Sequence, residues 1–370
     1  MKFLAIFLIS TAFLGCKKEL KKQVVMSKNT SFYVGTYTNG ESKGIYKYQI
    51  SKEGKLSKIK LVAETNNPSF LAKTKDNKTL LAVDETNEKG TGFVKSFKIK
   101  KDTLELISKS SSGGAHPCFI TVNNKNQVLV ANYSRGNVGF LTLDKQNKLS
   151  KLLNIQQHIG KGTTDRQQSP HAHSTWFHPN KEEIISVDLG TNELWFSKIN
   201  EGNNAFTFSN QKKLKLKEGA GPRHLVFHPN KNFIYVLNEL NNTISLVKEK
   251  DELYFVDFSI SMLPEGFTEF SKGADIHISK DGKFLYASNR GHNSIVIYGV
   301  NLENGNLKLI GFEDVKGINP RNFSLTPENK FLIVANQDSN NITSFKRDED
   351  SGLLVFVDEI SAPNPVCILF

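Results

Sequence analysis

The chain has 370 residues, of which 38% are hydrophobic and 23% charged, and its formal net charge is +11. This composition is typical of a folded globular protein, and the abundance of Phe, Val, Ile and Tyr favours strands over helices. The lysines neither gather on one helix face nor alternate with aromatic residues, so a nucleic-acid-binding protein is not indicated. Two interpretations of the charge remain, a solvated surface or attraction of an anionic ligand or membrane surface.

The first 30 residues are predicted to direct export rather than to fold. An apolar run over residues 3–14 is shorter than the roughly 20 residues that span a bilayer and fits the core of a signal peptide. The run ends just before Cys16, which resembles a bacterial lipoprotein signal, although Phe13 stands where leucine is usual. We therefore expect a signal peptide at 1–15, lipidation of Cys16 and a tether at 16–30. The protein would then be lipid-anchored in the cell envelope, in the periplasm or at the outer membrane; an uncleaved anchor is the alternative.

From residue 31 onward one pattern recurs about every fifty residues. Its clearest element is an apolar strand that ends in a polar residue, and these polar residues are Asp84, Asn132, Asp188, Asn238, Asn289 and Asn336. Each such strand follows a shorter apolar run and a turn such as HPNK, and precedes a Gly/Asn-rich turn and two more strands. Four antiparallel strands per fifty residues are typical of a β-propeller blade.

The two ends of the chain complete a seventh unit. The final residues, NPVCILF, match the first-strand phrase NPRNFSL of residues 319–325, whereas the segment 31–50 opens on a second strand. We expect the C-terminus to supply the inner strand of this blade and the N-terminal segment the outer three, which removes exposed sheet edges. Residues 31–370 are thus predicted to form one all-β domain, a seven-bladed β-propeller with four antiparallel strands per blade.

Residues with useful chemistry occupy equivalent positions of this repeat. Fifteen residues before a strand-end polar residue lie His173, Arg223 and Arg321. Directly after such a residue lie Glu239, Arg290 and Gln337. The first strand of a blade lines the central channel of a propeller, so we expect these side chains to converge at one mouth of the channel.

Other polar residues have structural interpretations. The HPN turns of His178 and His228 predict turn residues, and His171, His224 and His277 resemble ordinary strand histidines more than catalysts. The polar residues Asp188, Asn238 and Asn289 are expected to cap turns; a calcium site is the alternative, but nearby arginines would repel a cation. Glu239 could also form a plain buried ion pair with Arg223 or Arg290. Cys118 and Cys367 lie in apolar strand patterns and are predicted to be core residues rather than a disulfide or metal pair.

Several motifs together resemble one family. VGTYT, SPHAHS, GAGPRHLVFHPN, VLNEL and ASNRGHNSI are similar to the seven-bladed lactonases, which include bacterial 6-phosphogluconolactonase of the propeller type and the related fungal carboxy-muconate cycloisomerases. The resemblance covers nearly all of residues 31–370. It implies a site of one histidine, two arginines and a glutamate, at His173 (or its neighbour His171), Arg223, Glu239 and Arg290. Arg321 could fill the role of one arginine.

The resemblance implies hydrolysis of a sugar-acid lactone, 6-phosphogluconolactone or a similar anionic lactone, without a metal or other cofactor. Lactone hydrolysis needs a water deprotonated near neutral pH, and His173 or Glu239 could act as the base. Arg223 and Arg290 could stabilise the oxyanion. His171, Arg321 and Gln337 are predicted to bind the substrate, since arginine suits phosphate or carboxylate.

We expect attack by water rather than formation of an acyl-enzyme. The alternatives are a non-enzymatic envelope propeller, acting as a protein scaffold or sugar-acid binder, and a muconate-type cycloisomerase. The sequence does not indicate an oligomeric state.

Overall fold

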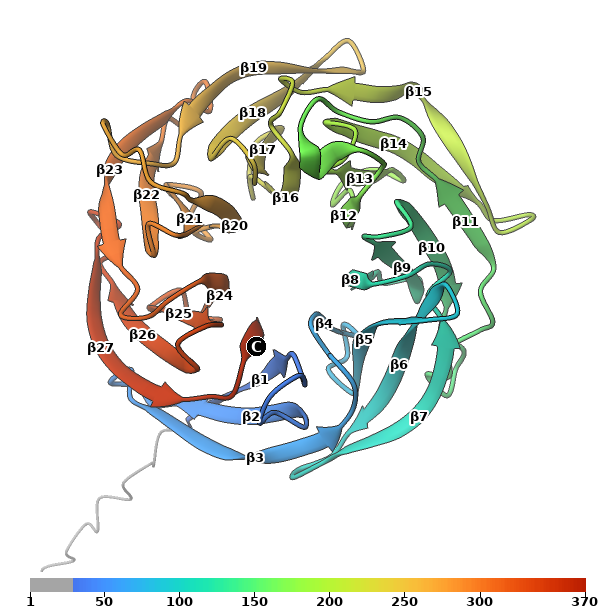
Figure 1. Cartoon of the computed structure of the whole chain (residues 1–370), viewed down its shortest axis with the longest axis horizontal. Coiled ribbons are helices and arrows are strands. Elements are labelled where there is room, and N and C mark those ends of the chain that lie inside the picture. Colours follow the sequence, from blue (N-terminus) through green and yellow to red (C-terminus); the bar gives the residue numbers. More distant parts are fainter. Residues whose placement is uncertain (1–28) are drawn as a thin grey trace, which may run out of the picture.

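The strand–turn–strand repeat is present in every blade of the computed structural model, which describes residues 29–370. Seven four-stranded antiparallel sheets stand around one axis, with the first strand of each sheet at the channel (Figure 1). The predicted seven-bladed propeller is therefore confirmed. The predicted signal peptide and Cys16 lie outside the described residues. Across residues 29–370, helices with the length and apolar character needed to cross a bilayer are absent.

Blade 1 contains, from the channel outward, β28 (Pro365–Leu369), β1 (Thr30–Thr36), β2 (Gly44–Ile50) and β3 (Leu56–Glu64). Blade 2 contains β4 (Leu71–Lys73), β5 (Thr79–Glu88), β6 (Thr91–Ile99) and β7 (Leu104–Ser111). Blade 3 contains β8 (Pro117–Val122), β9 (Gln127–Asn132), β10 (Asn137–Thr142) and β11 (Asn154–Gln157). Blade 4 contains β12 (Ala172–Phe177), β13 (Ile184–Asp188), β14 (Glu193–Asn200) and β15 (Ala205–Lys215).

Blade 5 contains β16 (Pro222–Phe227), β17 (Phe233–Asn238), β18 (Thr243–Lys250) and β19 (Leu253–Ser261). Blade 6 contains β20 (Lys272–Ile278), β21 (Phe284–Arg290), β22 (Ser294–Val300) and β23 (Leu307–Asp314). Blade 7 contains β24 (Pro320–Leu325), β25 (Phe331–Asn336), β26 (Asn341–Arg347) and β27 (Leu354–Ser361). A short 3-10 helix, η1 (Asp165–Gln167), lies in the loop between β11 and β12.

The asparagines of the repeat make the tight turns between second and third strands. Asn192, Asn242, Asn293 and Asn340 occupy this place in four blades, with φ between 53° and 59°. Asparagine adopts this left-handed conformation more readily than most residues, which explains why it recurs there.

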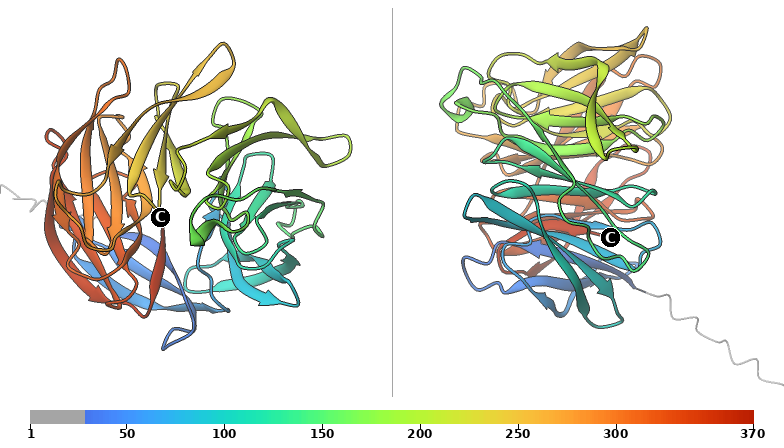
Figure 2. Two further views of the ribbon diagram at one scale, coloured as in Figure 1. Left: turned by 45° about the horizontal axis from the view of Figure 1, so that its top comes forward. Right: turned by 90° about the vertical axis from the view of Figure 1, so that its right-hand side faces the viewer.

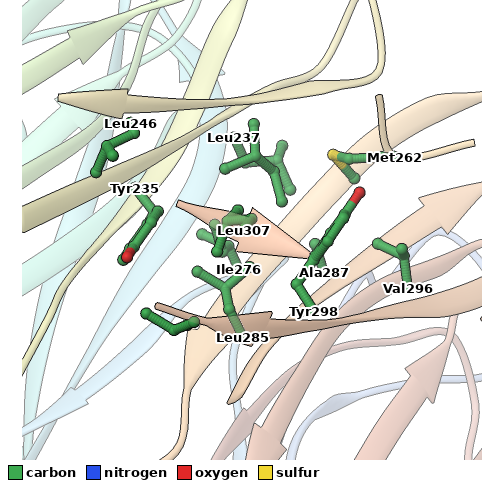
Figure 3. Close-up of a cluster of buried hydrophobic side chains, with 12 residues drawn as sticks. Tyr235, Leu237, Leu246, Met262, Ile276, Leu285, Ala287, Val296, Tyr298 and Leu307 are labelled. Carbon is green, nitrogen blue, oxygen red and sulfur yellow. The ribbon is translucent and has the colours of Figure 1, made fainter. Parts of the chain in front are cut away.

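The hydrophobic core lies between neighbouring blades. Between blades 5 and 6, Tyr235 and Leu237 of β17 pack with Ile276 of β20 and Leu285 of β21 (Figure 3). All four are fully buried, and burying one such side chain stabilises a fold by about 1.5–3 kcal/mol. Because the apolar side chains are used between blades, the channel at the axis is left for polar ones.

The ring is closed by the two ends of the chain. β28 pairs antiparallel with β1, with Val34 opposite Ile368, and the sheet continues through β2 and β3. This is the predicted arrangement, with the inner strand from the C-terminus. The predicted core cysteines Cys118 and Cys367 are both buried and unbonded to other cysteines.

Candidate active site

In six of the seven blades a β-bulge interrupts the pairing near the start of the inner strand. In blade 5, Pro222 pairs with Asn238 and His224 pairs with Leu237, so Arg223 is the extra residue. A bulge bends its strand and redirects the side chain that it carries. The residues at this position in blades 3, 4, 5 and 7 are Cys118, His173, Arg223 and Arg321. The repeated Pro-Arg phrase is therefore a bulge that delivers an arginine to the channel.

The residues that follow the strand-end polar residues occupy equivalent places at this end of the blades. These residues are Tyr37, Glu85, Tyr133, Leu189, Glu239, Arg290 and Gln337. In six of the blades the backbone N–H at this position donates to a carbonyl of the loop that enters the same blade, at 2.7–3.1 Å. The shared hydrogen bond explains why equivalent positions of the repeat meet at one end of the channel.

Glu239 lies at the centre of an arginine cluster. Its Oε2 is 3.1 Å from Nε of Arg223 and 2.9 Å from Nη2 of Arg290, and its Oε1 is 3.3 Å from Nη2 of Arg166. Glu239, Arg223 and Arg290 are buried. Burial would raise the pKa of Glu239, but the guanidiniums of Arg290, Arg223 and Arg166 outweigh burial and lower it to about 2. Glu239 therefore stays ionised at neutral pH and fixes the arginines.

His173 is a buried imidazole beside this cluster. Its Nδ1 lies 3.8 Å from Sγ of Cys118, and its ring centroid lies 5.4 Å from that of His224 and 5.5 Å from that of Tyr133. Burial, followed by the positive charge of Arg223, holds the pKa of His173 well below its usual range. The ring is therefore neutral at pH 7 and can accept a proton.

A second charged group lines the mouth from blades 7, 1 and 2. Nη2 of Arg321 donates to the hydroxyl of Tyr37 at 2.8 Å, and Tyr37 donates to Oε2 of Glu85 at 2.9 Å. The hydroxyl of Ser69 donates to the same oxygen. Glu85 is thus held by neutral hydroxyls, whereas Glu239 is held by arginines.

Deeper in the channel, polar side chains of blades 5, 6 and 7 form a network. Nδ1 of His224 lies 2.8 Å from Oδ1 of Asp275, and Nε2 of His277 lies 3.0 Å from Oδ2 of the same residue. Asn322 also donates to that Oδ2, at 2.5 Å. Burial, followed by the charge of Arg223, lowers the pKa of His224 to about 4. The two strand histidines therefore have structural partners, and the network ties three blades together at the axis.

The structure brings most of the residues predicted from the sequence together. His173, Arg223, Glu239 and Arg290 gather in one place, and Arg321 lines the same mouth. His171 lies further out, with its ring stacked on Tyr133 at 4.4 Å. Gln337 lines a surface hollow between blades 7 and 1, together with Asn39 and Tyr46.

Four residues of the mouth were missed by the sequence reasoning: Tyr37, Glu85, Tyr133 and Arg166. Glu85 directly follows Asp84, and Tyr133 directly follows Asn132. Both therefore occupy the same repeat position as Glu239, one residue after the polar residue that ends the second strand. Arg166 lies on η1, outside the repeat, and nothing in the periodic pattern points to it.

His178, His228 and Asp188 make the turn contacts that the sequence suggested, whereas Nδ2 of Asn238 donates to Ser245 and Nδ2 of Asn289 donates to the carbonyl of Met262. The Nδ1 atoms of His178 and His228 each accept the backbone N–H of the residue two positions on, at 3.1 Å, and so brace the HPN turns. Oδ1 of Asp188 accepts the N–H of Thr191 at 2.9 Å and caps the following turn. Within residues 29–370, His, Cys, Asp and Glu side chains do not form a group of three or more that could hold a metal ion.

Comparisons with known proteins agree with this architecture. The family model described as "Lactonase, 7-bladed beta-propeller" matches residues 31–370. A 6-phosphogluconolactonase of Bacillus subtilis is 35% identical over 345 residues, which span 91% of this chain and 97% of that protein. A 6-phosphogluconolactonase of Formosa agariphila is 35% identical over 333 residues, spanning 87% and 94%. The solved structure of a periplasmic gluconolactonase of Pseudomonas aeruginosa superimposes with a TM-score of 0.88 at 27% identity, covering 92% of this chain and 98% of that one.

Proposed function

Because the chain belongs to the seven-bladed β-propeller lactonases, a family of lactone-hydrolysing enzymes, we propose that it opens the lactone of a negatively charged sugar acid. The substrate would be 6-phosphogluconolactone or a lactone of similar charge, and the product is the open-chain acid. The residues of the channel mouth supply the groups that this hydrolysis needs.

The observation that carries the proposal is the charge of the mouth. Within residues 29–370, the four guanidiniums of Arg166, Arg223, Arg290 and Arg321 share it with the carboxylates of Glu239 and Glu85, while the carboxylate of Asp275 lies deeper, against His224 and His277. Glu239 is shared by three of these arginines and cannot neutralise them all. An anionic substrate would balance the excess positive charge, and arginines hold phosphate and carboxylate groups with directed hydrogen bonds.

The neutral His173 is the base in this proposal. It takes a proton from a water molecule as the water oxygen bonds to the lactone carbonyl carbon. Arg223 and Arg290 stabilise the negative charge that develops on the carbonyl oxygen. The bond between the carbonyl carbon and the ring oxygen then breaks, and the ring oxygen takes the proton back from His173 to become the hydroxyl of the product. Glu239, ionised down to a pH near its pKa of about 2, positions the arginines and takes no proton.

The proposal is tested by acid release from lactones by the purified protein. Glucono-δ-lactone, 6-phosphoglucono-δ-lactone and a simple aliphatic lactone are compared with their spontaneous hydrolysis at pH 7. We expect hydrolysis of the sugar-acid lactones, with the phosphorylated one preferred. Arg290→Gln should lose roughly a hundredfold or more of the rate, because it removes a group that stabilises the oxyanion. A protein that binds these lactones yet never exceeds their spontaneous opening would be a binding propeller instead.

A further inference from the structure

One loop of the propeller departs from the repeat and reaches the candidate site. The loops that lead into β8 and β16 span residues 112–116 and 216–221, whereas the loop between β11 and β12 spans residues 158–171. This longer loop, here called the strap, carries η1. In Figure 2 the strap, in green, projects from one face of the ring. The shorter loops show that blades can be connected without so many residues, which raises the question of what the strap contacts.

The strap is anchored at both ends and in its middle. Oδ2 of Asp188 lies 2.7 Å from Nδ1 of His158 at the start of the strap, and Oδ1 accepts the N–H of His171 at its end, at 2.9 Å. In the middle, the side chain of Gln167 is buried and donates to the carbonyl of Leu189 at 2.6 Å and to Oδ1 of Asn192 at 2.7 Å. These contacts hold the backbone of η1 against blade 4. They therefore also fix the position of the Cα atom from which the side chain of Arg166 extends.

Arg166 projects from the strap to the rim of the arginine cluster. Its Nη2 donates to the hydroxyl of Tyr133 at 2.9 Å and to Oε1 of Glu239 at 3.3 Å. Within residues 29–370 both contacts engage Nη2, which leaves the three N–H groups of Nε and Nη1 for a ligand. The side chain of Arg166 is 47% exposed, whereas those of Arg223 and Arg290 are 3% and 7% exposed.

We infer that Arg166 is the residue that recognises the anionic group of the substrate, a phosphate ester or a carboxylate, as it enters the mouth. This inference rests on the proposed function. Arg223 and Arg290 are buried against Glu239 and serve the reacting carbonyl, and Arg321 belongs to the separate group of Tyr37 and Glu85. Arg166 combines an exposed guanidinium with a backbone fixed through Gln167 and three N–H groups left over. It thus determines the preference for charged lactones, while the chemistry depends on the buried residues.

The test compares Arg166→Gln with Lys161→Gln, which removes an exposed charge from the same strap. Kinetics are measured on 6-phosphoglucono-δ-lactone and on uncharged glucono-δ-lactone. For Arg166→Gln we expect KM for the phosphorylated lactone to rise about tenfold or more, since a hydrogen-bonded charge pair is lost. This rise in KM should exceed the changes in kcat and in both constants for the uncharged lactone. Lys161→Gln should behave like the unaltered protein, and Arg166→Lys should restore part of the preference.

A second variant separates recognition from a merely structural role. Gln167→Ala keeps the guanidinium but removes the anchor of η1, so it should weaken binding of the phosphorylated lactone selectively. Equal losses on both lactones in Arg166→Gln would show that Arg166 only positions Glu239, and unchanged constants would also overturn the inference.

Binding of 6-phosphogluconate, followed by calorimetry, keeps the test independent of turnover. We expect Arg166→Gln to bind this acid about tenfold more weakly than the unaltered protein and than Lys161→Gln. If the unaltered protein opened neither lactone, the proposed function would fall, and calorimetry would still decide whether Arg166 holds the anion. If it opened both lactones and Arg166→Gln kept the preference and the affinity, only the present inference would fall.

Discussion

At the scale of single residues, the mouth separates two roles that the sequence left open between His173 and Glu239. Both are buried, but Glu239 is bound to arginines and its pKa is lowered to about 2. His173 has its pKa lowered by burial and by Arg223, so it is neutral at pH 7. A carboxylate that has to stay charged and an imidazole that has to stay neutral are complementary. The carboxylate of Glu239 holds the guanidinium groups in place, and the imidazole of His173 is free to take a proton.

Glu239→Gln is expected to destabilise the fold as well as the activity. Removing the carboxylate leaves Arg223 and Arg290 buried without their counter-ion, and breaking a buried pair in this way costs about 3–5 kcal/mol. Unfolding in denaturant should show this loss. Glu85→Gln is the matched control, because Tyr37 and Ser69 hold Glu85 with neutral hydroxyls and its loss should be smaller. A Glu239→Gln protein of unchanged stability that loses only the acid limb of its pH profile would make Glu239 the base.

His173→Gln is expected to change the pH dependence of the reaction. A base has to be unprotonated, and the pKa of His173 lies well below its usual range, so kcat/KM should stay level as the pH falls from 8 to 6.5. It should fall only well below pH 6.5, where His173 takes up a proton. His173→Gln should lose roughly a hundredfold or more of the rate and lose this acid limb. The control is His171→Gln, whose ring stacks on Tyr133 at the rim and should leave the limb in place.

At the scale of strands, ring closure depends on the last strand of the chain. β28 pairs with β1, and its Ile368 N–H donates to Oδ1 of Asn322 in the neighbouring blade at 2.6 Å. Val366, Cys367 and Ile368 are buried. The strand therefore fills the inner place of blade 1 and also contacts blade 7.

Removal of residues 365–370 is expected to abolish the folded monomer. The deletion exposes the inner edge of β1 and opens apolar clusters on both sides of blade 1, and an exposed edge invites aggregation. Size-exclusion chromatography and thermal unfolding would show aggregates or an early transition. Deleting Phe370 alone is the control, because it leaves β28 paired. A protein shortened by six residues that melts like the complete one would refute closure by this strand.

The same elements explain what could be predicted from the sequence. The blades were predictable because each one repeats the same apolar strands and turns, and equivalent positions must meet at one axis. The equivalence of repeat positions predicted Arg223, Glu239 and Arg290. The same equivalence could have predicted Glu85. Arg166 could not be predicted in this way, because its strap is unique to one connection and its position depends on the contacts of Gln167 and Asp188. The arginine contacts that distinguish Glu239 from His173 also depend on the tertiary structure and cannot be seen in the repeat.

At the scale of the whole molecule, the mouth and the start of the described chain lie at opposite faces. β1 begins at Thr30 and ends at Thr36, beside Tyr37 of the mouth. Seven residues of strand extend roughly 20 Å, so Thr30 lies near the face remote from the arginine cluster. A lipid on Cys16, which we propose from the sequence, would therefore be joined to the folded domain at the end of β1 that is remote from the site.

This geometry predicts that the anchor and the reaction are independent. Cys16→Ser should abolish lipid labelling and release the protein from the membrane fraction, because one thiol carries the acyl chains. Its kcat/KM for a soluble lactone should equal that of the anchored protein, since the tether meets the domain far from Arg166 and Glu239. Labelling with a fatty-acid analogue, fractionation and kinetics on both forms check this, with Cys118→Ser as a control that keeps the lipid. Unchanged labelling in Cys16→Ser would mean that the exported segment is not a lipoprotein signal. Release accompanied by a large change in kcat/KM would instead place the membrane close to the mouth.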